Sequence, residues 1–365
     1  MDKTVSVGVV GTSWFADVAH LQSLRSHPRA RIQAICGRNR NRAEEMAAKH
    51  SIPEVFTDYR EMIRRSKLDA VVVVVPDDLH HPVTMAALEA GLHVLCEKPL
   101  ALTGADARAM CEKAESAGVT NMTFFTYRWM PHYRFARELI DQGAIGSCYH
   151  CSIRYLGSYG RGTKYAWRFD RKRSCGILGD LGSHMIDLSR WLVGDISAVC
   201  ADVRTFVKRD SPSDGALEPA NDAAVLALRF GAGAHGTIQV SAVAQTGDRV
   251  QEQHVVIHGE KGAIEVDATW LGTEVRVAGQ QGRFAAVPVP DSFGATDKSR
   301  PPMEQFSQLF TTLPIGDRLF IDAILEGRQA APSLRDGMQA QLVVDAAIRS
   351  HAEGRWVSVD SGRAR

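Results

Sequence analysis

The sequence predicts a doubly wound α/β domain on a parallel sheet, followed by an α+β domain built on a large open, mainly antiparallel sheet. Valines 71–75 have the pattern of a fully buried strand, residues 82–89 have helical composition, and a second apolar run ends at Cys96. Strand, crossover helix and strand make a βαβ unit. After about residue 126, longer alternating strands are joined by glycine-containing turns, which are hairpin signals.

Length and composition set the broad class. A chain of 365 residues exceeds one ordinary core, and 45% hydrophobic with 23% charged residues is typical of a globular protein. A net charge of +1 gives no electrostatic basis for binding nucleic acid or an anionic membrane. The start carries no signal-peptide pattern, and the seven scattered cysteines suit a reduced compartment, so a cytoplasmic location is expected. Cys148 and Cys151, formally a C-x-x-C pair, fall on a predicted strand and point to opposite sides.

The first strand, residues 5–10, runs directly into a turn and then a helical stretch over 17–26. This is the context of a dinucleotide-binding turn, whose glycines permit a sharp bend and close approach of a pyrophosphate. Gly11 matches the first glycine, Ser13 takes the place of the second and Ala16 that of the third. Because the turn heads repeated βα units, we predict a Rossmann nucleotide site rather than an ordinary strand–turn–helix.

The end of the second strand, residues 30–36, bears on the choice of dinucleotide. An acidic residue there normally binds the ribose hydroxyls of NAD, but this chain has Gly37, Arg38 and Arg42 instead. Guanidinium groups suit a 2′-phosphate, so NADP is predicted in preference to NAD. The alternative is a solvated basic loop.

Polar residues follow the two strands of the βαβ unit. Asp77 and His80 come after the valine strand, and Glu97 and Lys98 come after Cys96. Ligands bind at the carboxyl ends of parallel strands, so the chemistry is expected at these four residues.

The remaining elements follow in order. A helix over 103–117 and a strand over 120–125 complete the first domain. The second half is predicted to contain a helix over 133–142, strands over 147–155, 198–206, 223–230, 236–242, 255–258 and 263–266, and closing helices over 306–325 and 334–353. The predicted domains are therefore residues 1–125, which bind NAD(P), 126–333, which bind substrate and oligomerise, and 334–365, which return to the first domain.

The second half holds one constellation that suits proton transfer. In a helix over 180–192, Asp180, His184 and Asp187 are spaced i, i+4, i+7 and would share one face. Histidine exchanges a proton near neutral pH and a neighbouring carboxylate can orient it. A structural histidine capped by carboxylates, or a metal site of these three residues, is the competing interpretation.

These motifs together resemble the Gfo/Idh/MocA family of NAD(P)-dependent oxidoreductases across nearly the whole chain. The resemblance rests on Gly11 with its turn, Pro76-Asp77-Asp78-Leu79-His80, Glu97-Lys98-Pro99, Trp167-Arg168 and Asp180-x-x-x-His184. Asp77 stands where that family usually has asparagine, and Cys175 stands where a glycine is frequent.

The resemblance implies hydride transfer between nicotinamide C4 and a secondary alcohol or ketone of a sugar, inositol or related polyol. Lys98 would stabilise charge on the reacting oxygen, and His184, oriented by Asp180, would handle the proton. It implies cofactor contacts by Gly11, Ser13, Trp14, Phe15, Arg38, Arg42, Pro76, Asp77, His80, Glu97, Lys98, Trp167 and Arg168. It implies substrate contacts by Lys98, Arg128, Tyr155, Trp167, Asp180 and His184, with no metal.

The resemblance also implies a homodimer or homotetramer formed through the sheet of the second domain. Two other functions are compatible with this scaffold: glycoside cleavage through transient oxidation by tightly held NAD, and a non-catalytic NAD(P)-sensing regulator. The intact Glu97-Lys98 and His184 argue against the regulator, because a sensor needs no proton-transfer pair.

Overall fold

The structure, a computed structural model, describes residues 3–213 and 215–360. Residues 1–2 and 361–365, which the predicted first and third domains include, lie outside the described residues. The chain divides into two compact units, residues 1–125 with 295–338 and residues 126–294 with 339–365. No helix within the described ranges combines the length and apolarity needed to span a bilayer.

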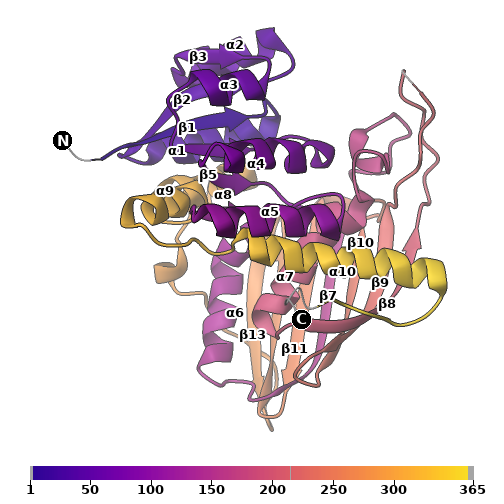
Figure 1. The fold of residues 1–365 in the computed structure, drawn as a ribbon. Coiled ribbons are helices and arrows are strands. Elements are labelled where there is room, and N and C mark those ends of the chain that lie inside the picture. The colour runs from indigo at the N-terminus through magenta and orange to yellow at the C-terminus, as the bar shows by residue number, and fades with distance from the viewer. Residues whose placement is uncertain (1–2, 214, 361–365) are drawn as a thin grey trace. The chain divides into compact units, whose positions relative to one another are not determined.

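The first unit is built on a parallel sheet with helices on both faces (Figure 1). Among the described residues it has six strands in the order β3-β2-β1-β4-β5-β6. The strands are β1 Val5–Val10, β2 Ala30–Cys36, β3 Glu54–Phe56, β4 Ala70–Val73, β5 His93–Cys96 and β6 Asn121–Thr123. The helices are η1 Ala16–Leu21, α1 Gln22–Ser26, α2 Arg40–His50, α3 Tyr59–Arg65, η2 Asp77–Leu79, α4 His80–Glu89, α5 Gly104–Ala117, α8 Pro302–Thr312 and α9 Asp317–Glu326. The doubly wound parallel sheet is confirmed.

The core of this sheet comes from the β-branched runs that predicted it. All four residues of β4 are fully buried, as expected for a strand covered on both faces. Helix α5 begins at an N-cap, Thr103, whose hydroxyl accepts a hydrogen bond from the Asp106 N–H, and it ends at Gly118 with φ 64°.

The second unit is built on a mixed sheet, of which only the β7–β10 pair is parallel among the described strands. Those strands lie in the order β14-β13-β12-β11-β7-β10-β9-β8-β15. They are β7 Cys148–Gly157, β8 Ile196–Arg204, β9 Ala223–Phe230, β10 His235–Ser241, β11 Gln251–Gly259, β12 Gly262–Thr269, β13 Gly272–Gly279, β14 Ala285–Ala286 and β15 Val357–Ser358. The large, mainly antiparallel sheet is thereby confirmed.

Helices lie along one side of this sheet (Figure 1), where α6 packs on β12 and β13 and α7 packs on β7. The helical elements are η3 Thr126–Trp129, α6 Pro131–Asp141, η4 Trp167–Phe169, η5 Leu178–Gly182, α7 Ser183–Leu192, η6 Gly247–Arg249, η7 Asp291–Phe293 and α10 Leu334–Glu353. On the opposite side, alternate residues of β7 and β10 such as Ser152 and Thr237 are exposed.

The two units differ from the predicted domains in the last quarter of the chain. Residues 295–333, predicted to join the second domain, pack with the first unit because α8 and α9 bury apolar faces against α1, β1 and β5. Residues 334–338 group with the first unit, whereas the later part of α10 groups with the second unit, in which β15 pairs with β8. The predicted return of the C-terminal segment to the first domain stays a prediction.

The predicted single helix over 306–325 is wrong. Two helices form instead, because Pro314 cannot continue a helix and Gly316 adopts φ 56° in the connection. The sequence reasoning also missed β13, in which two consecutive polar residues, Thr273 and Glu274, interrupt the alternation that Val275 and Arg276 continue.

Candidate functional site

The candidate residues of the first unit lie at the carboxyl edge of the parallel sheet, where β1 turns into η1. Gly11 has φ 129°, and a Cβ there would lie 2.0 Å from the carbonyl oxygen of Val74. Only glycine fits this turn, because both its backbone conformation and the close approach of the β4 end exclude a side chain. The sharp turn predicted from the sequence is therefore present.

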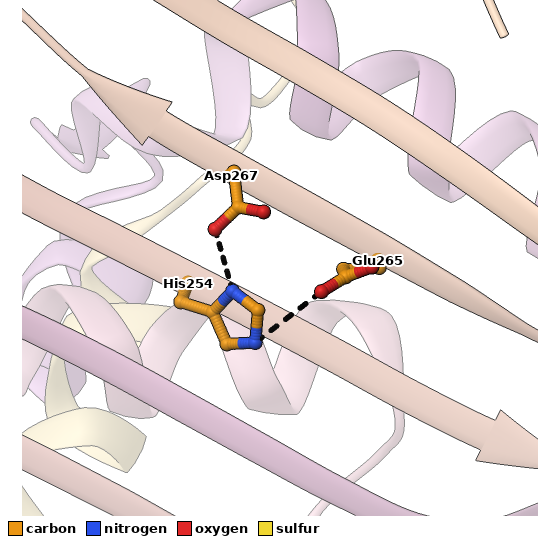
Figure 2. Close-up of side chains that lie close together, drawn as sticks. All are labelled: His254, Glu265 and Asp267. Carbon is orange, nitrogen blue, oxygen red and sulfur yellow. Dashed lines mark hydrogen bonds and ion pairs between the residues drawn. The ribbon is translucent and has the colours of Figure 1, made fainter. Parts of the chain in front are cut away.

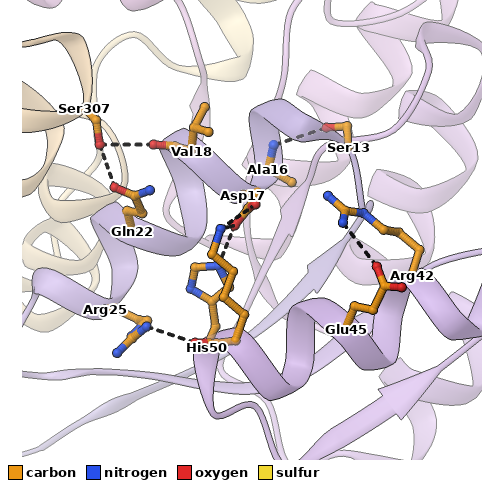
Figure 3. A network of polar contacts seen from close by, with 11 residues as sticks. Ser13, Ala16, Asp17, Val18, Gln22, Arg25, Arg42, Glu45, His50 and Ser307 are labelled. Atoms are coloured by element: carbon orange, nitrogen blue, oxygen red, sulfur yellow. Dashed lines mark hydrogen bonds and ion pairs between the residues drawn. The ribbon is translucent and has the colours of Figure 1, made fainter. Parts of the chain in front are cut away.

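The residues after Gly11 have different environments. The Ser13 hydroxyl oxygen accepts a hydrogen bond of 3.1 Å from the backbone N–H of Ala16 (Figure 3), which leaves the hydroxyl hydrogen able to donate. The side chain of Trp14 is 57% exposed, whereas Phe15 packs edge-on against Phe124. Of the three, Ser13 and Trp14 are accessible to a ligand at this turn.

The basic residues after β2 lie just before and within the first turn of α2, where Arg40 is exposed and Arg42 is half-buried. Asn39 caps α2 by accepting a bond from the Arg42 N–H at 3.1 Å. The Arg42 guanidinium pairs with Glu45 at 3.3 Å (Figure 3). Arg38 lies one residue before the cap and is also exposed. Arg38 thus lies nearer to the end of β2 than Arg42, and the charge of Arg42 is already paired with Glu45.

His80 braces two loops of the first unit. Its Nδ1 lies 2.7 Å from the Pro99 carbonyl oxygen and its Nε2 lies 2.9 Å from that of Val75. Because both partners are acceptors, both ring nitrogens must donate, which requires the imidazolium form. Burial lowers the pKa of His80, but Cys96, Asp77 and the Pro99 carbonyl together raise it to about 10. Both nitrogens of His80, which was predicted to contact the cofactor, therefore bond to the backbone that follows β4 and β5. Pro76 and the buried Asp77 precede His80 in the same turn.

Glu97 and Lys98 follow β5 at the same edge. One Glu97 oxygen accepts a bond of 3.2 Å from the backbone N–H of Lys98, and the other lies 3.0 Å from Nε2 of His20. Lys98 is half-buried, so its side chain has access to solvent. The carboxylate of Glu97 thus shapes the turn that presents Lys98.

The candidate residues of the second unit come from η5 and α7. His184 is 7% exposed, and its ring lies 4.6 Å from the ring of Tyr127 in η3. Asp187 accepts two hydrogen bonds, at 2.8 and 2.6 Å, from the Arg128 guanidinium. His184 and Asp187 therefore both face η3. Arg128, predicted to bind substrate, is occupied in this buried ion pair.

Asp180 lies in the wider turn of η5 and has its own partners. It accepts a hydrogen bond of 2.7 Å from the Tyr159 hydroxyl and pairs with Arg168 at 3.3 Å. The Arg168 guanidinium stacks 4.4 Å from the Trp167 ring. Three predicted site residues thus lie together, with Arg168 in contact with both the Asp180 carboxylate and the Trp167 ring.

Two tyrosines, Tyr127 and Tyr155, belong to the same group of residues in the second unit. Tyr127 donates to the Tyr155 hydroxyl at 2.9 Å, and Tyr155 donates to Gln251 at 2.8 Å. Burial, the largest cause, raises the pKa of Tyr155 to about 12, so both phenols stay protonated at neutral pH. Tyr127 was missed by the sequence reasoning because nothing in its local pattern marks it. The second unit thus offers an imidazole beside protonated hydroxyl groups, a combination that can exchange a proton and bind hydroxyl oxygens.

A separate cluster lies on β11 and β12. His254 Nδ1 lies 2.6 Å from Asp267 and its Nε2 lies 3.6 Å from Glu265 (Figure 2). These atoms could hold a metal ion. Arg276 already pairs with both carboxylates, at 3.0 Å to Glu265 and 2.5 Å to Asp267, so each of them has a cationic partner within the protein. We interpret the cluster as an ion-pair network of the sheet.

Comparisons with known proteins agree with this geometry. Residues 5–125 match a family model described as an oxidoreductase family NAD-binding Rossmann fold, and residues 137–359 match one described as the C-terminal α/β domain of the same Gfo/Idh/MocA oxidoreductases. The chain is 29% identical over 356 residues to levoglucosan dehydrogenase of Pseudarthrobacter phenanthrenivorans, covering 90% of this chain and 89% of that protein.

One further relative and one solved structure extend the comparison. Inositol 2-dehydrogenase of Rhizobium meliloti is 28% identical over 359 residues, covering 98% of this chain and 99% of that protein. A solved structure of levoglucosan dehydrogenase in complex with NADH and levoglucosan superposes with a TM-score of 0.88 at 28% identity, covering 98% of this chain and 100% of that one.

Proposed function

Because the chain belongs to the Gfo/Idh/MocA oxidoreductase family, we propose that it is a dehydrogenase that interconverts a secondary alcohol and a ketone on a sugar, inositol or related polyol. The observation that carries the proposal is the presence of one set of candidate residues in each unit: Lys98, whose backbone N–H bonds to Glu97, and His184 beside Tyr127. The names of similar proteins, levoglucosan and inositol dehydrogenases, support the substrate class.

The turn at Gly11 suits a dinucleotide, because its backbone comes close to β4 without a side chain in the way. The bound nicotinamide would supply the hydride acceptor or donor. Lys98 would bind the reacting oxygen and stabilise the negative charge that develops on it. His184 would take the hydroxyl proton in oxidation and return it in reduction, and Asp180 would orient the His184 imidazole.

The test is a screen of the purified protein with NAD⁺ and NADP⁺ against levoglucosan, inositols and other polyols, and in the reverse direction with the matching ketones. Growth of the absorbance of the reduced nicotinamide is the expected result. Release of free sugar from glycosides without net cofactor reduction would instead favour the transient-oxidation chemistry. Absence of turnover in every combination would contradict the proposal.

We propose further that NADP is preferred over NAD. The support is the position of Arg38, exposed directly after β2 where an acidic residue would repel a 2′-phosphate. The complexes of levoglucosan dehydrogenase contain NADH, which makes NAD the competing outcome.

Arg38→Ala is expected to weaken NADPH binding about 10-fold while NADH binding stays within about 2-fold, since only NADPH carries the 2′-phosphate. The measurement is fluorescence titration with both cofactors, with Trp14 as reporter. Arg40→Ala is the matched control, because Arg40 is exposed on the same segment and pairs with Glu44 at 3.5 Å. Equal losses for both cofactors, or tighter NADH binding by the unmodified chain, would assign Arg38 to the solvated surface.

We also propose that the chain forms a homodimer or homotetramer through the uncovered side of the second sheet. That side carries cross-strand polar pairs, including His150 with His235 at 2.9 Å and Arg154 with Glu252 at 3.3 Å. Light scattering at several protein concentrations measures the assembly directly. A monomer at all of them would contradict the proposal.

A further inference from the structure

A chain of buried polar contacts runs through the first unit and ends at the backbone of Lys98. His20, in η1, has no exposed surface. Its Nδ1 lies 2.9 Å from Asp317 and its Nε2 lies 3.0 Å from Glu97. The second oxygen of Glu97 accepts a hydrogen bond of 3.2 Å from the Lys98 N–H. Asp317, His20, Glu97 and the Lys98 amide thus form one continuous series.

The geometry requires a charged imidazole. A neutral ring has one N–H, so one of the two carboxylates would face a lone pair. An ionised carboxylate that is buried without a donor is strongly unfavourable, whereas an imidazolium donates to both. Among the described residues, the titratable groups that face the imidazole of His20 are Glu97 and Asp317, and the rings of Phe15 and Phe124 pack against it.

The place of Asp317 in the fold favours negative charge. Asp317 is the first residue of α9, at the positive end of the helix dipole, and it is completely buried. The pKa of His20 agrees with this arrangement: burial lowers it, but Asp317 and Glu97 outweigh burial and raise it to about 10. His20 is therefore cationic at any pH at which such an enzyme would work.

We propose that His20 is a positioning residue, a buried imidazolium that holds Glu97 against the Lys98 backbone and so sets the place of the Lys98 ammonium. The inference rests on the function proposed above, in which Lys98 binds the reacting oxygen. It gives Glu97 a role within the protein, because both of its oxygens are bound by protein donors.

The chain offers a matched control for this role. His27 is also buried in the first unit and its Nε2 pairs with Asp322 of α9 at 3.0 Å, but it does not contact Glu97. His27→Gln therefore breaks a comparable bond to α9 and spares the Lys98 turn. His20→Gln retains a single donor group and cannot satisfy both carboxylates.

His20→Gln is expected to lower kcat about 10- to 100-fold with little change in the Kd of the cofactor, because small displacements of a catalytic group are costly. His27→Gln should stay within about 2-fold of the unmodified enzyme. In a Lys98→Met background, His20→Gln should lower kcat by less than about 2-fold, since its effect passes through Lys98. Equal losses in the His20 and His27 variants, or a full His20 effect without Lys98, would overturn the proposal.

A second measurement does not depend on activity. Hydrogen exchange of residues 93–100 should be faster in His20→Gln than in His27→Gln, because the Lys98 amide loses its fixed acceptor. If no substrate is ever turned over, the proposed function fails while this comparison still decides the role of His20. Equal exchange in the two variants would overturn that role.

The pH dependence of stability supplies a further readout. The folded-state pKa of His20 is about 10, above its usual 6.5, so its stabilisation is complete below about pH 6.5 and disappears as pH rises through about 10. The unmodified chain should lose stability across this window in urea denaturation, and His20→Gln should lose less. Parallel pH curves for the two proteins would show that His20 is not charged in the fold.

Discussion

Replacing Lys98 by methionine is expected to lower kcat by about 10²–10³-fold, the loss typical of removing one donor to a developing negative charge. The substitution keeps the length of the side chain but removes the ammonium group. Cofactor binding should remain within about 3-fold, because the interaction is made mainly in the transition state. Steady-state kinetics with the best substrate of the screen and fluorescence titration of the cofactor provide the two numbers.

Lys67→Met is the control for this substitution. Lys67 is an exposed lysine between α3 and β4 of the same unit, so its loss changes net charge equally and should leave kcat unchanged. A Lys98 variant that keeps most of its kcat, or that loses cofactor binding to the same extent as kcat, would contradict the role assigned to the ammonium group.

His184→Asn is expected to lower kcat by about 10²–10⁴-fold, the range attributed to a positioned general acid or base. Asparagine keeps a polar group of similar reach but cannot exchange a proton near neutral pH. The pH dependence of kcat/KM should also change, because the limb that reports the imidazole disappears. Rates measured over a series of buffers give both the loss and the change of profile.

His351→Asn is the control for His184, since His351 is exposed in the last turn of α10, in a part of that helix that groups with the second unit. An unchanged pH profile in the His184 variant would assign the titrating group to another residue, and Tyr155 would be tested next by its phenylalanine variant. A kcat close to that of the unmodified enzyme would leave His184 as a packing partner of Tyr127.

Local patterns were enough to predict the first sheet. The strands over 5–10 and 30–36 have the predicted bounds because apolar runs of this kind are bounded by polar or glycine residues. The last helices were harder, since the composition of residues 306–325 is helical throughout and only Pro314 and Gly316 interrupt it. The domain assignment of residues 295–333 depends on which apolar face they cover, which no local pattern records.

For the candidate site residues too, the sequence predicted some contacts and not others. The spacing of His184 and Asp187 correctly indicated a shared helix, and both residues face η3. Asp180 precedes that helix in a wider turn and binds Tyr159 and Arg168, contacts that regular spacing does not predict. His20 gave no signal at all, because its partner Asp317 lies 297 residues away in the sequence.

Because Asp317 lies late in the sequence, it constrains how the first unit folds during synthesis. The first unit needs residues 295–338, so a ribosome has already synthesised every strand from β7 to β14 before Asp317 can reach His20. The edge of β6 is also completed late, by the Thr123 N–H bond of 2.9 Å to the Pro332 carbonyl. A chain truncated after residue 125 therefore holds His20 and Glu97 without Asp317, and leaves the β6 edge open to pairing with other chains. The N-terminal segment consequently remains incompletely packed until residues 295–338 have also been synthesised.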